Sequence, residues 1–424
     1  MNHSPEKRWQ TILVLVLSAL GILFFLLQAL GIGIFWLISL FDTQTGTLGN
    51  VSNSLLVWAS ILSALLLVPS LWLSINQLRG KPAPAWLDGH KPWIKWLILA
   101  SILIWPVVIV SGWFISGKPG LAVFILGPVN ILVAVIPVVW AYFLAQRKLA
   151  AGSLARKWRI FGFSLTITPI LIIITEAIVL ILAGLLLLLL ITVLGSIFPE
   201  FGQTISDLAD QLADMQSTGV LQDELNAILS QPLVVFGVLA VISGIVPLIE
   251  EILKPIALWS LVGRDLTDQE GFVAGLLSGA GFALMENLLY FTNVITSEDW
   301  LTMAIGRAGT GVLHMFGAGL VGWGLARAWR KGKWPFLALM LVLAVFTHGL
   351  WNALALFAGL GSELIVIADI SFKQQLLYYL PLLFLLLVQI LVLFLINRRF
   401  QEVQVVTKNV LMDQVESEAP NSTN

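Results

Sequence analysis

Long runs of apolar residues dominate the chain, and short polar or charged segments separate them. A membrane-spanning α-helix needs about 20 mostly apolar residues, because the hydrocarbon core of a bilayer is about 30 Å thick. Ten such runs follow one another, near residues 11–40, 54–76, 94–116, 121–146, 160–197, 232–262, 271–295, 301–326, 335–359 and 376–397. The pattern therefore predicts an all-α, polytopic integral membrane protein with about ten transmembrane helices.

The composition supports this class and excludes others. Of the 424 residues 58% are hydrophobic and 11% are charged, whereas soluble domains carry about 25% charged residues. The absence of cysteine excludes disulfides, thiolate metal sites and a cysteine nucleophile. A formal net charge of -1 gives no reason to expect a nucleic-acid partner, so the lipid bilayer is the expected surroundings.

The distribution of basic residues predicts the orientation in the membrane. Lysine and arginine gather in 77–95, 147–159, 327–334 and directly after the last run, whereas 198–231 holds acidic residues and neither lysine nor arginine. Cytoplasmic loops carry the excess of basic residues. With an even number of spans, we therefore expect a multi-pass protein of the cell (plasma) membrane with both termini in the cytoplasm.

The same pattern divides the chain into five segments. We expect a five-span accessory membrane region at 1–197, whose fifth run is long enough for tilt, an extension or a break near Pro169. An acidic, amphipathic extracytoplasmic loop follows at 198–231, and a four-span core at 232–359. An outer loop with the last span occupies 360–397, and a polar, disordered cytoplasmic tail occupies 398–424.

Ionisable residues inside the apolar runs are the candidates for chemistry. A charge near the bilayer centre costs about 2.5–3.5 kcal/mol, so such side chains usually face the protein interior and serve a function. Away from their ends, the first five runs contain only Glu176, for which we expect a structural hydrogen bond. The core holds the remainder, which are Glu250, Glu251, Lys254, Glu286, Arg307, His314 and His348. Arg307 is expected near the outer boundary, where its long side chain can reach water.

The sixth run contains two adjacent carboxylates and a lysine. Glu250 and Lys254 are four residues apart in the order that favours an ion pair on one helix face. Glu251 projects about 100° away, so we expect the two carboxylates to face different neighbours. Pro255 cannot donate the next helical hydrogen bond, so the helix should bend there.

The seventh and eighth runs carry stripes of small residues. Such stripes let helix backbones approach closely, and those found here are Gly271, Gly275 and Gly279 in one run and Ala318, Gly322 and Ala326 in the other. Glu286, four residues after Phe282, falls on the side of Gly279, and His314 begins the second stripe. Both side chains should therefore point into a helix contact rather than into lipid.

The ninth run places His348 and Asn352 on one helix face. An imidazole with a neutral amide donor one turn away can stabilise an oxyanion. At 1.5 Å per residue, the depths expected for Glu250, Glu286, His314 and His348 allow them to share one site. A glutamate could activate water there, or zinc could bind to these four residues. These residues alone are consistent with an intramembrane hydrolase or a proton-coupled transporter.

Four motifs in order, EEILK at 250–254, FALME at 282–286, His314, and HGLWN at 348–352, resemble the PrsW family of intramembrane proteases. This family belongs to the broader CAAX-protease and Abi-like superfamily. The resemblance implies that Glu250 activates water, with Glu251 and Lys254 in support. Glu286, His314, His348 and Asn352 would complete the site, and Phe282 belongs to the second motif.

The resemblance also implies a type of reaction and substrate. The protein would be an intramembrane endopeptidase, either of the glutamate type or a metalloprotease. It would cleave membrane-anchored or single-span proteins, as in site-1 cleavage of an anti-sigma factor. The CAAX endopeptidases have FxxxH and EExxxR where this chain has Phe282 to Glu286 and EExxK, so CAAX cleavage is not expected.

Two other classes of function remain open from the sequence. A proton- or ion-coupled transporter would also place carboxylates near the bilayer midplane, although no inverted repeat is visible in the sequence. A non-enzymatic, Abi-like membrane scaffold would use the polar residues only to hold its helices together. In that case Glu250→Gln would reduce stability without a separate functional defect.

Overall fold

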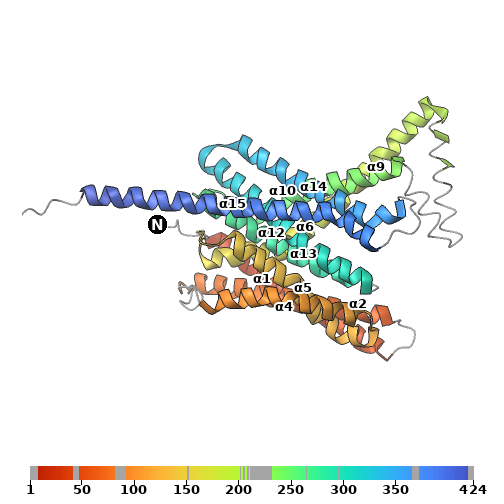
Figure 1. Cartoon of the computed structure of the whole chain (residues 1–424), viewed down its shortest axis with the longest axis horizontal. Helices are drawn as coiled ribbons and strands as arrows, with labels where there is room; N and C mark the ends of the chain where they lie inside the picture. The colour runs from red at the N-terminus through yellow and green to blue at the C-terminus, as the bar shows by residue number, and fades with distance from the viewer. Residues whose placement is uncertain are drawn as a thin grey trace, which may run out of the picture. The chain divides into compact units, whose positions relative to one another are not determined.

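A computed structural model describes residues 8–41, 47–81, 92–149, 152–200, 202–203, 206–207, 210, 232–263, 265–293, 297–364 and 372–418. The described residues are almost entirely helical and contain no strand (Figure 1). The principal helices are α1 (Arg8–Ser39), α2 (Thr47–Leu78), α4 (Pro92–Ser116), α5 (Pro119–Ala145), α6 (Leu154–Ile197), α9 (Pro232–Ala240), α10 (Val246–Leu253), α11 (Ile256–Trp259), α12 (Asp268–Tyr290), α13 (Ser297–Lys331), α14 (Trp334–Leu364) and α15 (Phe372–Glu418). The prediction of an all-α polytopic membrane protein is confirmed.

Within the described residues, nine helices are long and apolar enough to cross a membrane. The eighth predicted span, 301–326, lies in α13, which is more polar and is not among the nine. Its 35 residues extend further than the apolar thickness of a bilayer, at about 1.5 Å per residue. A helix rich in polar groups can occupy the membrane when it is enclosed by other helices, and the residues of α13 from Gly309 to Ala326 are buried.

Two predicted helix breaks have different outcomes. α6 continues through Pro169 without interruption, so its length is not accommodated by a break. The sixth predicted span, by contrast, is divided at Lys254 and Pro255, where α10 ends and the short α11 begins. Because a proline has no N–H to donate, this bend follows directly from Pro255.

The polar C-terminal segment is helical where the structure describes it. α15 continues from the last predicted span to Glu418, so the prediction of a disordered tail from 398 is wrong for residues up to 418. An i, i+4 ion pair between Arg398 and Glu402, at 3.0 Å, supports the continuation. Most of the predicted acidic loop at 198–231 lies outside the described residues.

The chain forms two compact units, which we describe separately. Unit 1 contains residues 1–169, 254–344 and 386–424, and unit 2 contains residues 170–253 and 345–385. In unit 1, α1 packs along α2, and α5 packs against both α2 and α4 (Figure 1). The most extensive packing in this unit is between α12 and α13.

The stripes of small residues explain how closely α12 and α13 approach. A Cβ atom on Gly275 would overlap the carbonyl oxygen of Ala318, and one on Gly279 would overlap that of His314. Backbone thus packs against backbone along this contact, as the sequence pattern predicts. Consequently, the position of His314 depends on the absence of a side chain at Gly279.

The accessory helices of unit 1 cover the opposite face of α12. Gly281 lies against the backbone of α6, where an added Cβ would be 2.7 Å from the carbonyl oxygen of Phe161. Ser164 of α6 and Ser278 of α12 form a buried hydrogen bond of 2.8 Å. As a result, 83% of the apolar window of α12 is buried.

Capping interactions determine where α12 begins. Thr267 accepts a hydrogen bond from the backbone N–H of Glu270, and the Glu270 carboxylate accepts one from the N–H of Thr267. This reciprocal arrangement satisfies two donors that a helix start would leave unpaired. Arg156 of α6 pairs with Glu270 at 2.9 Å and joins the cap to the accessory region.

The close contact between α12 and α13 gives a first prediction. Gly279→Ala should destabilise the protein by about 1–3 kcal/mol, because the new methyl group would displace the backbone at His314. The matched control is Gly306→Ala in α13, since a Cβ there meets nothing within 4 Å. Thermal unfolding of the detergent-solubilised proteins measures the difference, and equal melting temperatures for the two variants would contradict the packing argument.

Candidate functional site

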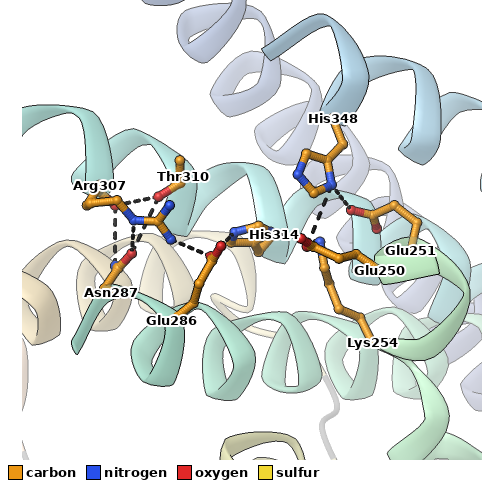
Figure 2. A network of polar contacts seen from close by, with 9 residues as sticks. All are labelled: Glu250, Glu251, Lys254, Glu286, Asn287, Arg307, Thr310, His314 and His348. Atoms are coloured by element: carbon orange, nitrogen blue, oxygen red, sulfur yellow. Dashed lines mark hydrogen bonds and ion pairs between the residues drawn. The ribbon is translucent and has the colours of Figure 1, made fainter. Parts of the chain in front are cut away.

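In unit 1, His314 lies between a lysine and a glutamate (Figure 2). Its Nδ1 is 2.7 Å from Nζ of Lys254, and its Nε2 is 2.6 Å from Oε2 of Glu286. The imidazole is 1% exposed and the lysine is fully buried, so both contacts are shielded from water. The predicted proximity of these three residues is therefore present in the structure.

The partners of His314 determine which ring nitrogen carries the proton. A lysine ammonium can donate hydrogen bonds but cannot accept them, whereas an ionised carboxylate can only accept. Nδ1 of His314 therefore accepts from Lys254, and the Nε2–H group donates to Glu286. A neutral His314 therefore carries its proton on Nε2 and its lone pair on Nδ1, the ring nitrogen that faces away from Glu286.

Arg307 is part of the same buried network, contrary to the sequence-based expectation. Its Nη2 donates to Oε2 of Glu286, and its Nε donates to Oδ1 of Asn287 at 2.7 Å. The guanidinium also stacks over the ring of Tyr290, 4.3 Å from its centroid. With a side chain only 11% exposed, Arg307 does not extend to water at the outer boundary. It extends to the carboxylate instead, because an ion pair compensates a buried charge better than partial hydration does.

Asn287 fixes the position of this guanidinium. Its Oδ1 accepts from Arg307, and its Nδ2 donates to the backbone oxygen of the same arginine at 3.3 Å. Thr310, one turn later in α13, donates to that backbone oxygen at 2.9 Å. The sequence reasoning did not identify Asn287 or Thr310, although Asn287 directly follows the FALME motif.

The bend at Pro255 positions Lys254. The hydroxyl group of Ser278 donates to the carbonyl oxygen of Lys254, which lies where the helical hydrogen-bond ladder is interrupted. Phe282 packs against both polar side chains, with its ring centroid 5.1 Å from Nζ of Lys254 and 5.1 Å from the His314 ring, edge to face. Phe282 therefore contributes an apolar wall and a cation–π contact rather than a reacting group.

In unit 2, two adjacent carboxylates approach one imidazole nitrogen. Nδ1 of His348 is 2.9 Å from Oε1 of Glu251 and 3.9 Å from Oε2 of Glu250 (Figure 2). The expectation that the carboxylates face different neighbours is thus wrong, because His348 lies within reach of both. All three residues are at most 6% exposed. The hydrogen bond to Glu251 places the proton of a neutral His348 on Nδ1 and the lone pair on Nε2.

Asn352 shares a helix with His348, as predicted, but its amide has a backbone partner. Nδ2 of Asn352 donates to the carbonyl oxygen of Ile242 at 2.9 Å. Ile242 belongs to a π-helical turn, Val241–Ile245, between α9 and α10. The amide predicted as an oxyanion donor therefore binds the main chain that precedes the two carboxylates.

The structure thus assembles the predicted residues as two groups. One, in unit 1, contains Lys254, Phe282, Glu286 and His314, to which Arg307 and Asn287 are added. The other, in unit 2, contains Glu250, Glu251 and His348, with Asn352 on the adjacent turn. Glu176 lies in the unit 2 part of α6 and belongs to neither set of contacts given above.

Comparison with known proteins finds one similar family for this region. Residues 208–395 match the model of the PrsW family intramembrane metalloproteases. No curated protein and no solved structure matches the chain. The matched region includes all four motifs and both groups of buried polar residues described above. The multiple apolar helices show a multi-pass membrane protein, and the match shows that its residues 208–395 are similar to the PrsW family intramembrane metalloproteases.

Proposed function

We propose that this protein hydrolyses peptide bonds of membrane-anchored or single-span proteins at a site formed by Glu250, Glu251, Lys254, Glu286, His314 and His348. One observation carries the proposal. Each buried histidine uses one ring nitrogen to bind its own glutamate, His314 with Glu286 and His348 with Glu251. Such carboxylate–histidine pairs orient the imidazole and increase the basicity of the other nitrogen, as histidine ligands of catalytic metals require.

The order of residues in the chain supports a common site. Glu250 of unit 2 and Lys254 of unit 1 are separated by only three residues. Lys254 is in turn within hydrogen-bond distance of His314, and Glu250 lies near His348. We therefore propose that the two groups act together, which the sequence-based depths also favour.

The residues fit a metal ion of the kind that the family description implies. Glu250, His314 and His348 are buried, and each offers one ligand atom, a carboxylate oxygen or an imidazole nitrogen. Two imidazoles and a carboxylate are a usual donor set for catalytic zinc. When bound, zinc would lower the pKa of a water molecule and polarise a carbonyl group. We propose zinc as the cofactor on the basis of this donor chemistry, and its binding to Nδ1 of His314 would replace the hydrogen bond from Lys254.

The protein's own residues account for proton transfer and orientation. One oxygen of the Glu250 carboxylate would hold the metal ion, and the other would accept a proton from the attacking water and later deliver it to the leaving amine. Glu251 would keep His348 in its Nδ1–H form through the 2.9 Å hydrogen bond. Lys254 would place a positive charge beside Nδ1 of His314, where negative charge on the tetrahedral oxygen can be stabilised. Burial would exclude other water and strengthen these interactions.

Glu286 would support His314 rather than react. It accepts from both Arg307 and Nε2–H of His314, so its charge is compensated and its oxygens are directed at these donors. The sequence alone left Glu286 as a protonated group, a partner of Lys254 or a metal ligand. The ion pair with Arg307 favours an ionised glutamate that holds the imidazole.

Glu250→Gln should abolish proteolysis, because an amide cannot accept the proton of the attacking water. We expect neo-N-termini near membrane spans in host membranes that express the wild type, and at least about 100-fold fewer with the variant at matched expression. A zinc chelator should reduce them similarly, and added zinc should restore them. Mass spectrometry of protein N-termini measures both effects.

The matched control is Glu176→Gln, which makes the same change at an intramembrane glutamate of α6 outside the proposed site. It should give the wild-type set of neo-N-termini. An unchanged set with a well-folded Glu250→Gln variant would exclude the protease and make a transporter or a scaffold the better assignment. Chelator-resistant cleavage that still requires Glu250 would favour a glutamate-type mechanism.

The ion pair between Glu286 and Arg307 gives a separate prediction. Arg307→Gln should cost about 3–5 kcal/mol of stability, because it leaves the carboxylate of Glu286, whose side chain is only 19% exposed, without this cationic partner. The double variant Glu286→Gln/Arg307→Gln should regain most of this loss but remain inactive, since a glutamine no longer provides the charge that holds His314. Thermal unfolding and substrate cleavage measure the two effects. Additive losses of stability would contradict the pairing.

A further inference from the structure

The helix that carries the two adjacent carboxylates has an irregular turn before them. The N–H group of Val246 donates to the carbonyl oxygen of Val241, five residues earlier, instead of to the residue four positions back. This π-helical turn separates α9 from α10, in which Glu250 and Glu251 lie one turn further on. A π-turn adds one residue to the helical turn and thereby changes the direction in which later side chains project. The orientation of both carboxylates therefore depends on it.

Pro247 explains why the turn needs a partner from another helix. An α-helical ladder would use the N–H of residue 247 to satisfy the carbonyl of Ser243, and a π-helical ladder would use it for the carbonyl of Ile242. Proline has no N–H, and the N–H of Val246 is directed at Val241. Ile242 lies on the outside of the helices, in an apolar span. Lipid offers no hydrogen-bond donor, so a carbonyl oxygen left unpaired there is costly and an external donor is required.

Helix α14 supplies that donor. Nδ2 of Asn352 is 2.9 Å from the carbonyl oxygen of Ile242. Gly349, three residues earlier on the same face, lies so close to Ser243 that a Cβ atom would overlap its carbonyl oxygen. α14 thus packs directly against the carbonyl groups of Ile242 and Ser243, to which Pro247 cannot donate a hydrogen bond. The residue before Gly349 is His348, which binds Glu251 at 2.9 Å.

We infer that Asn352 is a positioning residue, whose amide holds the Ile242 carbonyl and so fixes the π-turn that aims Glu250 and Glu251 at His348. The contacts of Asn352 and Gly349 connect the main chain of the π-turn to α14, and those of His348 connect α14 to the carboxylates. Both connections lie within unit 2. This role replaces the direct donation to substrate that the spacing of His348 and Asn352 had indicated, and it rests on the proposed protease function.

A double-mutant cycle between Asn352→Ala and Pro247→Ala tests the inference. Pro247→Ala restores an N–H that can satisfy the exposed carbonyls, so the need for Asn352 should diminish. We expect Asn352→Ala alone to lower kcat for a single-span test substrate by about 100-fold, as small misplacements of catalytic groups do, with little change in KM. In the Pro247→Ala background the same substitution should cost less than about threefold. Its effect on the melting temperature should shrink in parallel.

The matched control is Asn397→Ala. Asn397 also donates its amide to a backbone carbonyl, that of Ala145 at 2.7 Å in unit 1, but no proline in its own turn creates that need. Its substitution should lower the melting temperature by the same amount in the wild-type and the Pro247→Ala backgrounds. An equal fold loss of kcat for Asn352→Ala in both backgrounds, as expected of an amide that touches the substrate, would overturn the inference.

The two proposals can fail separately. If the wild type does not cleave the substrate, and so does not differ from Glu250→Gln, the proposed function fails. The melting temperatures of the wild type, the two single variants and the double variant still report the coupling of Asn352 to Pro247. If the Pro247→Ala variant is itself inactive, the melting temperatures alone test the positioning role of Asn352. Coupling of the two substitutions, with none between Pro247 and Asn397, supports the positioning role. Equal shifts in both backgrounds exclude it.

Discussion

The structure depends on one constraint, which is that charged side chains among apolar helices must be compensated by partners of opposite charge or by hydrogen bonds. Glu286 meets it through Arg307 and His314, and Glu251 meets it through His348. Each of these contacts joins two different helices. The compensation of charge therefore also determines which helices pack together, and it holds the imidazoles in defined orientations.

The accessory region contributes to this arrangement by excluding lipid and water from α12. Hydrogen bonds such as that between Ser164 and Ser278 attach α6 to the face of α12 opposite α13. Ser278 in turn holds the carbonyl of Lys254. A helix that is surrounded in this way can keep ionisable side chains buried although it is less apolar than its neighbours.

The sequence predicted the elements of this architecture well because their causes are local. Apolar runs predicted the helices, small-residue stripes predicted the close contact of α12 with α13, and Pro255 predicted the bend after α10. The motifs also selected the residues that form the two buried groups. The contacts within these two groups were less predictable. The ion pair between Arg307 and Glu286, for example, depends on how two helices are rotated toward each other. The hydrophobic periodicity of a single helix carries no information about its rotation relative to a neighbouring helix.

Asn352 shows the same limit in another form. Its spacing from His348 indicated a shared face, which is correct, but not which group the amide would bind. That partner is a carbonyl left unsatisfied by Pro247 in a different helix, and a π-turn cannot be recognised from hydrophobic periodicity. Pro247, in an apolar span close to the acidic pair, marks a missing donor, but it was not considered in the sequence analysis. Only the packing of α14 shows which residue replaces that donor.

The central claim is that these compensated charges form a centre for peptide-bond hydrolysis within the membrane. The most direct measurement reconstitutes the purified protein in liposomes with a library of single-span peptides and identifies the products by mass spectrometry. The account predicts cleavage at a defined bond in or next to the span, lost with Glu250→Gln. Intact peptides throughout, with correctly folded wild-type protein and zinc present, would contradict it.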